Sequence, residues 1–483
     1  EINEDTNEVK LIFSVQPGNR TYTRKILFTG NDITQDYVLR REMRQFEGAW
    51  TSDNSIEAGK VRLERLGYFK EVNVETIPVP GTEDQIDIVY SVEEETTGSV
   101  GGNIGYSDFG LMLGFNLQEQ NFLGSGNTVG IGINKNIYSE MYNISYMNPY
   151  ATRDAVSLGY NVFFRETDYG EFNVANYLTN SNGFGAQFGY PISDISRLGF
   201  NITYDKTDID IGTLPAREIY DFVSVEGNIF ETLTAQLSWQ QVTLNRGLFP
   251  TDGASTVISL SSTIPGSDLN YYRFNIRQRY YQPLSSDFVF GFQGEIGYLD
   301  SFGDTEEIPF FQNFYAGGPR SLRGFESNTL GPRSTDAPCY EFNYEEGTCP
   351  NLIDTDGDGE PDAPYLNPYA NQGQRSRYRD APIGGNMKVE GSLQLIFRLP
   401  FIEDQRSLRS AFFFDFGNVF SDNCKEYQIN CSELSVDELR YSYGVGVTWI
   451  TGFGPMSLAI AKPTNAGPLE RTEEFQFTVG NVF

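Results

Sequence analysis

The sequence contains no histidine. This excludes Ser-His-Asp and Cys-His catalysis, a histidine general base and histidine-ligated zinc. The sequence also has no run of 18 or more apolar residues, which excludes a transmembrane helix. Basic residues are scarce, with 35 Lys and Arg against 65 Asp and Glu, and the net charge is −30. This balance argues against binding to nucleic acid or to an anionic membrane surface.

Cysteine is rare, with four residues in two close pairs. Four cysteines allow three connectivities, of which pairing within each close pair is the simplest. No Cys-x-x-Cys spacing indicates zinc, so we predict the disulfides Cys339–Cys349 and Cys424–Cys431, formed in an oxidising compartment. No signal peptide opens the chain, and Glu1 begins in mid-element, so we expect a fragment of a longer exported protein.

Aromatic residues and glycine are abundant although apolar residues are not. Phe, Tyr and Trp make up 14% of the chain and Gly numbers 49, while the apolar fraction is only 39%. A soluble globular protein with so few apolar residues would not usually carry so many aromatics. A transmembrane β-barrel accommodates both facts, because only every second residue of its strands faces lipid.

Residues 20–96 have the pattern of a small soluble α+β domain, and residues 1–19 that of the end of a similar preceding domain. Strands are predicted at 22–28, 72–77 and 86–92. A first helix is predicted from Thr34 to Gly48, with Leu39, Met43 and Phe46 on its inner face. A second helix, capped by Asp53, ends at Gly67. We expect a sheet with both helices on one face.

From Gly98 onward the hydrophobic pattern has a period of two. One face of each segment is apolar and aromatic, and the other is Gly, Asn, Gln, Ser or charged. This pattern predicts a membrane protein with a 16-stranded antiparallel transmembrane β-barrel over 97–483. A soluble sandwich is the alternative, but these small polar faces would not fill its interior. The segments are 99–107, 111–118, 129–134, 142–146, 155–165, 181–190, 197–207, 233–245, 254–264, 270–282, 288–299, 387–398, 409–420, 439–451, 455–463 and 473–483.

Residues 215–228 could add a seventeenth strand. An even number places both ends of the barrel on the side of the preceding domain, and Pro215 suits the start of a helix. We therefore predict a surface helix here. With sixteen strands, the connections 300–386 and 421–438 lie on the same, outer side, and each contains one cysteine pair.

The connection 300–386, called the long loop below, is too long for a turn, and its first part is rich in aromatics and glycine. Phe-Tyr-Ala-Gly-Gly at 314–318 precedes the tetrad Leu322, Arg323, Gly324 and Phe325. This pair of motifs resembles loop six of the Omp85-type barrels, in which Val commonly stands at the position of Leu322. The segment from Gly59 to Phe69 is similar to the POTRA pattern. The resemblance covers essentially the whole chain.

Arg323 needs a partner if the long loop folds into the barrel. In the strand 409–420 the residues Phe412, Phe414 and Phe416 face outward, so Asp415 points inward. In the preceding strand Glu390 and Gln394 also face inward. The family usually has a second acid at the position of Gln394, which is neutral here. Asp415 is therefore the expected partner in a guanidinium–carboxylate lock.

The first and last strands meet at a junction that we call the seam. Glycine in the first strand weakens pairing, so the seam could open and present an edge to an incoming strand. An ordinary seam, in which the glycines accommodate the curvature of the barrel, is equally consistent with the sequence. The C-terminal Phe483 resembles the β-signal of outer-membrane proteins. The expected gate residues are Gly101, Gly102, Asn103, Ile104 and Gly105 on the first strand, and Phe475, Phe477, Val479 and Gly480 on the last.

The long loop also contains a run of acidic residues. Asp354, Asp356, Asp358 and Asp362 alternate with Gly and small residues, and the spacing resembles the short calcium loops of thrombospondin-type repeats. Tyr365 stands where an EF-hand would have a distal Glu ligand, so a solvated acidic loop is an equally good reading. We expect no other cofactor.

The family resemblance implies a non-enzymatic insertase in the bacterial outer membrane, with the POTRA domain in the periplasm. Its expected partners are unfolded outer-membrane protein clients, periplasmic chaperones, accessory lipoproteins of an assembly complex and outer-membrane lipid. Clients would enter the bilayer through a lateral gate at the seam. The alternatives are a two-partner secretion transporter that exports a soluble protein through its lumen, and, more distantly, a barrel protease or phospholipase.

Overall fold

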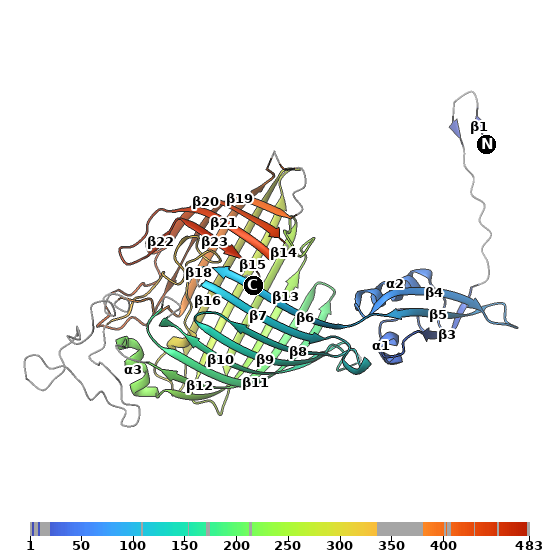
Figure 1. Cartoon of the computed structure of the whole chain (residues 1–483), viewed down its shortest axis with the longest axis horizontal. Helices are drawn as coiled ribbons and strands as arrows, with labels where there is room; N and C mark the ends of the chain where they lie inside the picture. Colours follow the sequence, from blue (N-terminus) through green and yellow to red (C-terminus); the bar gives the residue numbers. More distant parts are fainter. Residues whose placement is uncertain are drawn as a thin grey trace, which may run out of the picture. The chain divides into compact units, whose positions relative to one another are not determined.

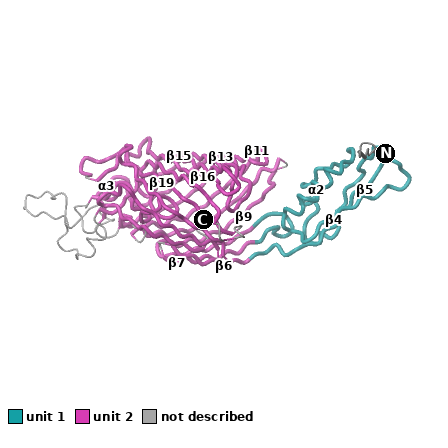
Figure 2. Tube along the Cα trace, turned by 90° about the horizontal axis from the view of Figure 1, so that it is seen from above, with its two compact units in different colours: residues 1–99, 119–128 teal, residues 100–118, 129–483 magenta. Residues whose placement is uncertain are grey.

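The structure is a computed structural model. It describes residues 20–107, 110–152, 154–170, 174–211, 215–335, 380–399, 402, 407–428, 430–451 and 454–480, together with the backbone of 2–3 and 8–9. The chain divides into two compact units, coloured separately in Figure 2. Unit 1 comprises 1–99 and 119–128, and unit 2 comprises 100–118 and 129–483. No helix in these ranges is long and apolar enough to cross a membrane.

Unit 1 contains a three-stranded sheet and two helices around one core. The sheet order is β3-β5-β4, with β3 parallel to β5 and β4 antiparallel to it. Alternate residues of β5 face the helices because side chains alternate along a strand, and Ile88 and Tyr90 are fully buried against Leu39 and Leu63. The elements are β3 Tyr22–Thr29, α1 Asp36–Arg40, α2 Asp53–Arg65, β4 Phe69–Pro78 and β5 Gln85–Glu94, preceded by the paired strands β1 Ile2–Asn3 and β2 Glu8–Val9.

The first helix is much shorter than the sequence predicts. It ends at Arg40, and Phe46, expected on its inner face, is exposed. The chain turns back because residues 48–51 bond to the backbone at the start of β3, with Gly48 donating to the Thr23 carbonyl at 2.7 Å. Gln45 fixes this return, since its amide donates to the Trp50 carbonyl at 2.9 Å. The N-cap of α2 is Ser52, one residue before the predicted Asp53.

Residues 119–128 connect the first two strand pairs of the barrel but belong to unit 1. They contain the short 3-10 helix η1 Phe122–Gly124. The Gln35 amide donates to the Gly124 carbonyl at 2.9 Å, and the Asn121 amide donates to the Thr34 hydroxyl at 2.8 Å. A side chain at Gly124 would collide with the Ile33 carbonyl, which explains the glycine. Within unit 1, residues 119–128 are thereby held to the start of α1.

Unit 2 is a closed antiparallel barrel of 16 strands, as the sequence predicts. Strands follow one another around the barrel in chain order, and β23 closes on β6 at the seam (Figure 1). The strands are β6 Gly98–Ser107, β7 Gly110–Glu119, β8 Thr128–Lys135, β9 Ser139–Asn148, β10 Ser157–Asp168, β11 Leu178–Ser193, β12 Ser196–Asp210, β13 Ile229–Val242, β14 Gly253–Thr263, β15 Tyr271–Pro283, β16 Phe288–Ser301, β18 Met387–Phe397, β19 Leu408–Phe420, β20 Arg440–Thr451, β21 Gly454–Pro463 and β23 Phe475–Val479.

The barrel has an apolar outer face and a polar inner face. On β19, Phe412 and Phe414 are exposed on the outside whereas Phe413 and Asp415 are buried inside. Four leucine and phenylalanine residues on β7 repeat the outward pattern: Leu111, Leu113, Phe115 and Leu117. The large outward residues supply a lipid-facing surface, because they recur at every second position.

When β6 is counted as the first barrel strand, the connections that follow the odd-numbered strands are the larger ones. The predicted helix is α3 Arg217–Glu226, which lies between the seventh strand, β12, and the eighth, β13. The disulfide Cys424–Cys431 is present between β19 and β20, as predicted. The expected disulfide Cys339–Cys349, the acidic run with Asp354, Asp356, Asp358 and Asp362, and Phe483 all lie outside the described residues.

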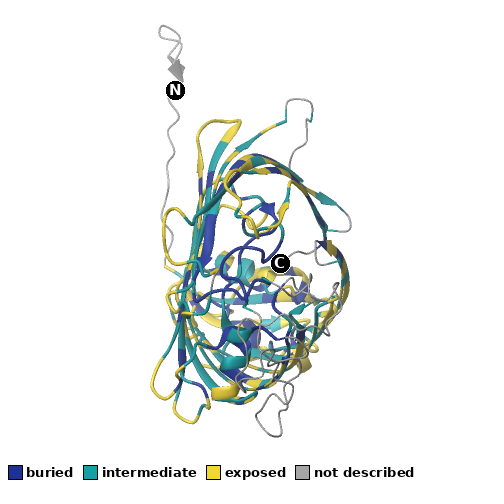
Figure 3. Ribbon diagram, turned by 90° about the vertical axis from the view of Figure 1, so that its left-hand side faces the viewer, coloured by how far each residue is buried: buried dark blue, intermediate teal, exposed yellow. Residues whose placement is uncertain are grey.

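The long loop enters the barrel. It contains η3 Phe310–Gln312 and β17 Gly324–Phe325, and β17 pairs with β22 Thr472–Glu473. Phe310, Phe314, Leu322, Phe325 and Leu330 are buried in one cluster. Figure 3 shows buried coil inside the ring of strands. The barrel is therefore filled by its own loop near the outer end.

Candidate functional site: the anchored loop and the seam

The tetrad of the long loop sits on tight glycine turns. Gly317 and Gly318 have positive φ angles of 106° and 98°, and the Gly318 amide donates to the Phe325 carbonyl at 3.1 Å. Gly324 has φ of 89°, and a Cβ there would lie 3.1 Å from Ala461 Cβ on β21. Glycine lets the loop backbone approach the barrel wall while Leu322 and Phe325 remain buried.

Arg323 forms a bidentate ion pair with Asp415 on β19. Its Nε donates to Oδ2 and its Nη2 to Oδ1, each at 2.7 Å, and the Arg323 backbone amide donates to Oδ2 at 3.2 Å. The Asp415 side chain is 0% exposed and that of Arg323 is 16% exposed. The guanidinium lies 3.5 Å from the ring centroid of Phe413, and Nη2 also donates to the Ser392 hydroxyl at 2.9 Å. The structure thus brings the expected pair together.

Glu390 and Gln394, the two inward residues of β18 that the sequence analysis considers, do not contact Arg323 directly. Glu390 accepts a hydrogen bond from the Ser321 hydroxyl at 2.5 Å and pairs with Lys388 at 3.1 Å. Gln394 donates to the Ser392 hydroxyl at 3.2 Å. Glu390 therefore holds the residue two before Arg323, and Gln394 reaches the guanidinium only through Ser392.

Gln476 of the last strand is a site residue that the sequence analysis missed. Its Nε2 donates to the Phe325 carbonyl at 2.8 Å, and its Oε1 accepts the Gly324 amide at 3.3 Å. One side chain on β23 thus satisfies two backbone groups of β17. The inward position of Gln476 in the alternating strand was visible in the sequence, but its partners were not.

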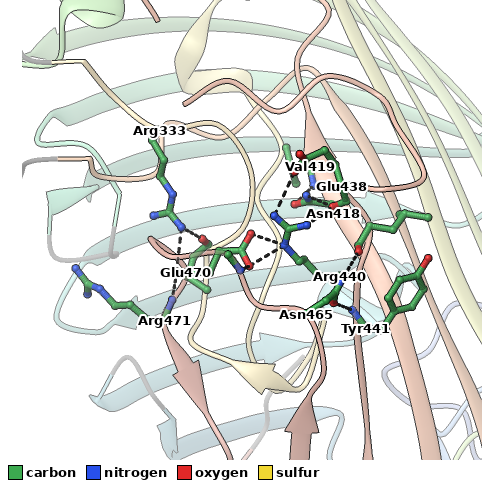
Figure 4. A network of polar contacts seen from close by, with 12 residues as sticks. Arg333, Asn418, Val419, Glu438, Arg440, Tyr441, Asn465, Glu470 and Arg471 are labelled. Atoms are coloured by element: carbon green, nitrogen blue, oxygen red, sulfur yellow. Dashed lines mark hydrogen bonds and ion pairs between the residues drawn. The ribbon is translucent and has the colours of Figure 1, made fainter. Parts of the chain in front are cut away.

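The segment 464–474 between β21 and β23 joins the long loop to the wall (Figure 4). Arg440 on β20 donates from Nε to both carboxylate oxygens of Glu470, at 2.7 and 2.8 Å, and both side chains are largely buried. The Arg471 amide donates to the Thr329 hydroxyl at 2.9 Å. Burial lowers the pKa of the neighbouring Arg333 to about 10, and the nearby Glu470 acts in the opposite direction. This segment, which contains β22, therefore connects β20 with the long loop.

In the described part of the chain, the seam has fewer registered pairs than the junction of β23 with β21. Val479 pairs with Tyr106 in the single registered pair between β23 and β6 in the described part of the chain. Five registered pairs join β23 to β21. A Cβ at Gly480, which has φ of 92°, would lie 2.6 Å from the Ile104 carbonyl oxygen, and one at Gly105 would lie 3.1 Å from that of Val479.

The other expected gate residues lie along the same two strands. Gly101 and Gly102 have no heavy atom closer than about 3.9 Å to an added Cβ, so no close approach requires glycine there. Phe475 and Ile104 face outward and are exposed. Among the gate glycines, Gly105 and Gly480 are therefore the two that the seam geometry requires.

The connections at the outer end of the barrel are hydrogen-bonded to one another. Both oxygens of Glu218 on α3 accept the Thr335 amide at 3.1 Å, and burial raises the pKa of this carboxyl. Tyr427, inside the Cys424–Cys431 loop, donates to Asp221 at 2.7 Å. The amide of Arg333 donates to the Asn430 carbonyl at 2.9 Å. Helix α3, the disulfide loop and the long loop therefore form one connected cap.

A closed 16-stranded barrel with an inward loop anchored by Arg-Gly-Phe, preceded by a small α+β domain, defines a class of outer-membrane proteins. The family model described as the Omp85 superfamily domain matches residues 121–483. The POTRA model, described as a surface antigen variable number repeat, matches residues 21–95. The chain belongs to the Omp85 superfamily. Its barrel lies in the outer membrane and its POTRA domain in the periplasm.

A relative named BamA is similar to this chain over its whole length. The outer membrane protein assembly factor BamA of Neisseria meningitidis is 30% identical over 100% of this chain and 59% of its own length. The crystal structure of BamA from Haemophilus ducreyi lacking POTRA domains 1–3 has a TM-score of 0.80 and 32% identity, covering 99% of this chain and 88% of that one. CdiB from Acinetobacter baumannii shares the fold, with a TM-score of 0.55 and 10% identity over 95% of this chain and 74% of that one.

Proposed function

We propose that this chain is the membrane part of an outer-membrane protein insertase that admits β-barrel clients through the seam. The observation that carries the proposal is the seam itself. Among the residues that the structure describes, one registered pair joins β23 to β6 and five join β23 to β21, and we propose that β23 separates from β6 at this junction between the first and last strands. Opening there exposes two strand edges for pairing with a client strand.

The anchored loop supports a mechanism in which the wall next to the seam stays in place while the seam opens. Arg323 holds the loop to β19, and Gln476 holds the loop to β23. The edge of β23 is therefore supported from inside the barrel by contacts independent of β6. A client strand that pairs with a supported edge finds its backbone partners already ordered, which lowers the entropic cost of the first pairing.

No nucleotide or cofactor enters this mechanism, and we propose that the protein is not an enzyme. Backbone groups left unpaired in lipid are strongly unfavourable, so each new strand pair favours the next. The energy comes from pairing and from burial of the client's apolar face. The proposed partners are unfolded barrel clients, periplasmic chaperones and accessory lipoproteins, with the POTRA domain receiving clients in the periplasm.

The test is a reversible crosslink across the seam. Tyr106→Cys with Val479→Cys places cysteines at Cα partners. We expect oxidation to abolish insertion of an unrelated barrel client into proteoliposomes, and reductant to restore it. The matched control is Val445→Cys with Ile460→Cys, register partners on β20 and β21, which should leave insertion unchanged. Single-cysteine variants control for mispairing with native cysteines. Full insertion with a completely crosslinked seam would refute lateral opening.

A second experiment separates insertion from export through the lumen. The full-length parent protein is depleted in cells, and the outer-membrane levels of many unrelated barrels are measured. Loss of all of them supports the insertase, and loss of one secreted protein with normal barrel levels supports a transporter.

A further inference from the structure

A cavity of about 840 Å³ opens at the periplasmic end of the barrel. Its walls come from three connections, those after β13, β15 and β18. Successive strands are antiparallel, so these connections lie at the end where β6 begins, the end to which the POTRA domain is joined. Arg409 shares the inward face of β19 with Asp415, and Arg398 follows the inward face of β18. The cavity is therefore separate from the anchored loop at the outer end.

Three arginines line this cavity: Arg246, Arg398 and Arg409. Within the described ranges, none of them forms an ion pair with a carboxylate. Arg409 lies 4.8 Å over the ring of Tyr281, and its Nη2 is buried with no hydrogen-bond partner among the residues described. A buried donor without a partner is unfavourable in the folded protein. Two exposed guanidinium groups and one buried donor without a partner, gathered in one cavity, indicate a site for an anion.

The rest of the lining is mainly apolar. Phe249, Val289 and Ile396 contribute to it, and Asp287 is its one carboxylate among the described residues. Phe249 has a φ of 49°, in the left-handed region that a bulky residue rarely adopts, and the next residue, Pro250, is buried. Strained backbone of this kind is concentrated at functional sites. An apolar wall with guanidinium groups fits an organic anion better than an inorganic one.

We propose that this cavity binds an acidic, apolar segment of an unfolded client chain. Carboxylates of the segment pair with the arginines, and its aromatic or aliphatic side chains pack on Phe249 and Ile396. A chain of this class offers such segments, since residues 473–480 here read Glu-Glu-Phe-Gln-Phe-Thr-Val-Gly. The lipid bilayer lies outside the barrel, so a lipid headgroup does not have the same access to an inward-facing cavity. This inference rests on the proposed insertase function, to which it adds a holding site for the client.

The direct test is binding of a fluorescent peptide with the sequence of residues 473–480 to the full chain in detergent, followed by anisotropy. We expect the double variant Arg398→Gln/Arg409→Gln to weaken binding by about tenfold or more, and replacement of both peptide glutamates by glutamine to do the same. The matched control is Arg197→Gln, an exposed arginine at the same end of the barrel, on β12, which should leave binding unchanged. If the double variant fails to fold, Arg398→Gln alone, at an exposed position, carries the test.

Each of three binding results would overturn the inference, as would the phosphate competition described next: unchanged binding in the arginine variants, equal loss in Arg197→Gln, or equal binding of the glutamine peptide. Inorganic phosphate is tested as a competitor of the peptide. Complete displacement of the peptide by an equal concentration of phosphate would show that the cavity is a site for small anions, and it would overturn the inference. Insertion is measured on the same preparations. Insertion without peptide binding refutes the holding site and leaves the insertase standing, whereas peptide binding without insertion refutes the insertase alone.

Discussion

Replacement of Arg323 by alanine should strongly destabilise the long loop inside the barrel. Asp415 is fully buried and receives three hydrogen bonds from Arg323, of which two come from the guanidinium. Arg323→Ala leaves a buried carboxylate without its counter-charge, which costs about 3–5 kcal/mol. It also removes the contact of the guanidinium with Phe413, at 3.5 Å, worth about 1–2 kcal/mol when desolvated.

Arg323→Lys should be a partial defect. Lysine retains the charge but cannot donate at once to both oxygens of Asp415 and to Ser392. We expect a loss of about 1–3 kcal/mol. The control is Arg277→Ala, which removes an exposed arginine from a lumenal ion pair while Glu295 keeps its ion pair with Lys388, and it should cost no more than about 1 kcal/mol.

The decisive assay is a double-mutant cycle of Arg323→Ala and Asp415→Asn, measured on urea unfolding in lipid vesicles and on client insertion. Partners in one interaction should show a coupling energy of about 1.5 kcal/mol or more, with the second change adding little to the first. Glu390→Gln, which weakens only the contact with Ser321, should have a smaller effect, and Gln394→Glu should place a second acid near Ser392 and strengthen the anchor. Strictly additive penalties for Arg323 and Asp415 would refute the anchored-loop reasoning.

Four further outcomes are expected. Gln476→Ala leaves two backbone groups of β17 without their partner and should make the long loop more sensitive to protease by about tenfold, while Gln476→Glu should lose only the bond to the Phe325 carbonyl. Gly480→Ala should widen the seam, because its Cβ would collide with the Ile104 carbonyl, and should raise the accessibility of a cysteine at Tyr106 to a maleimide reagent. Burial raises the pKa of Glu218, so the folded state binds this proton more tightly than the unfolded state, and stability falls as the pH rises above the pKa of the unfolded chain. The thermal midpoint of Glu218→Gln should therefore increase relative to that of the native chain as the pH rises from about 4. A difference in midpoint that does not change with pH would contradict this assignment. Millimolar Ca²⁺ should protect residues 350–365 from protease and show heat on titration calorimetry, and absence of both would leave an acidic solvated segment.

The sequence alone determined the membrane barrel, the number of its strands, the helix at 217–226 and the side on which the long connections lie. Each of these depends on local patterns: alternation within a strand, a proline before a helix, or the parity of a count. The inward position of Asp415 followed in the same way, because neighbouring phenylalanines fix the face of the strand. The pairing of Cys424 with Cys431 was predictable because the two lie seven residues apart.

Only the tertiary structure decided which residues meet across the lumen. Arg323 and Asp415 lie 92 residues apart, and Gly324 and Gln476 lie 152 apart. Their contact depends on the register of every intervening strand and on the path of the long loop, which no local pattern encodes. The early end of α1 at Arg40 has the same origin, because bonds from residues 48–51 to β3 compete with continuation of the helix. Periodicity fixes which way a side chain points, whereas packing and register fix what it touches.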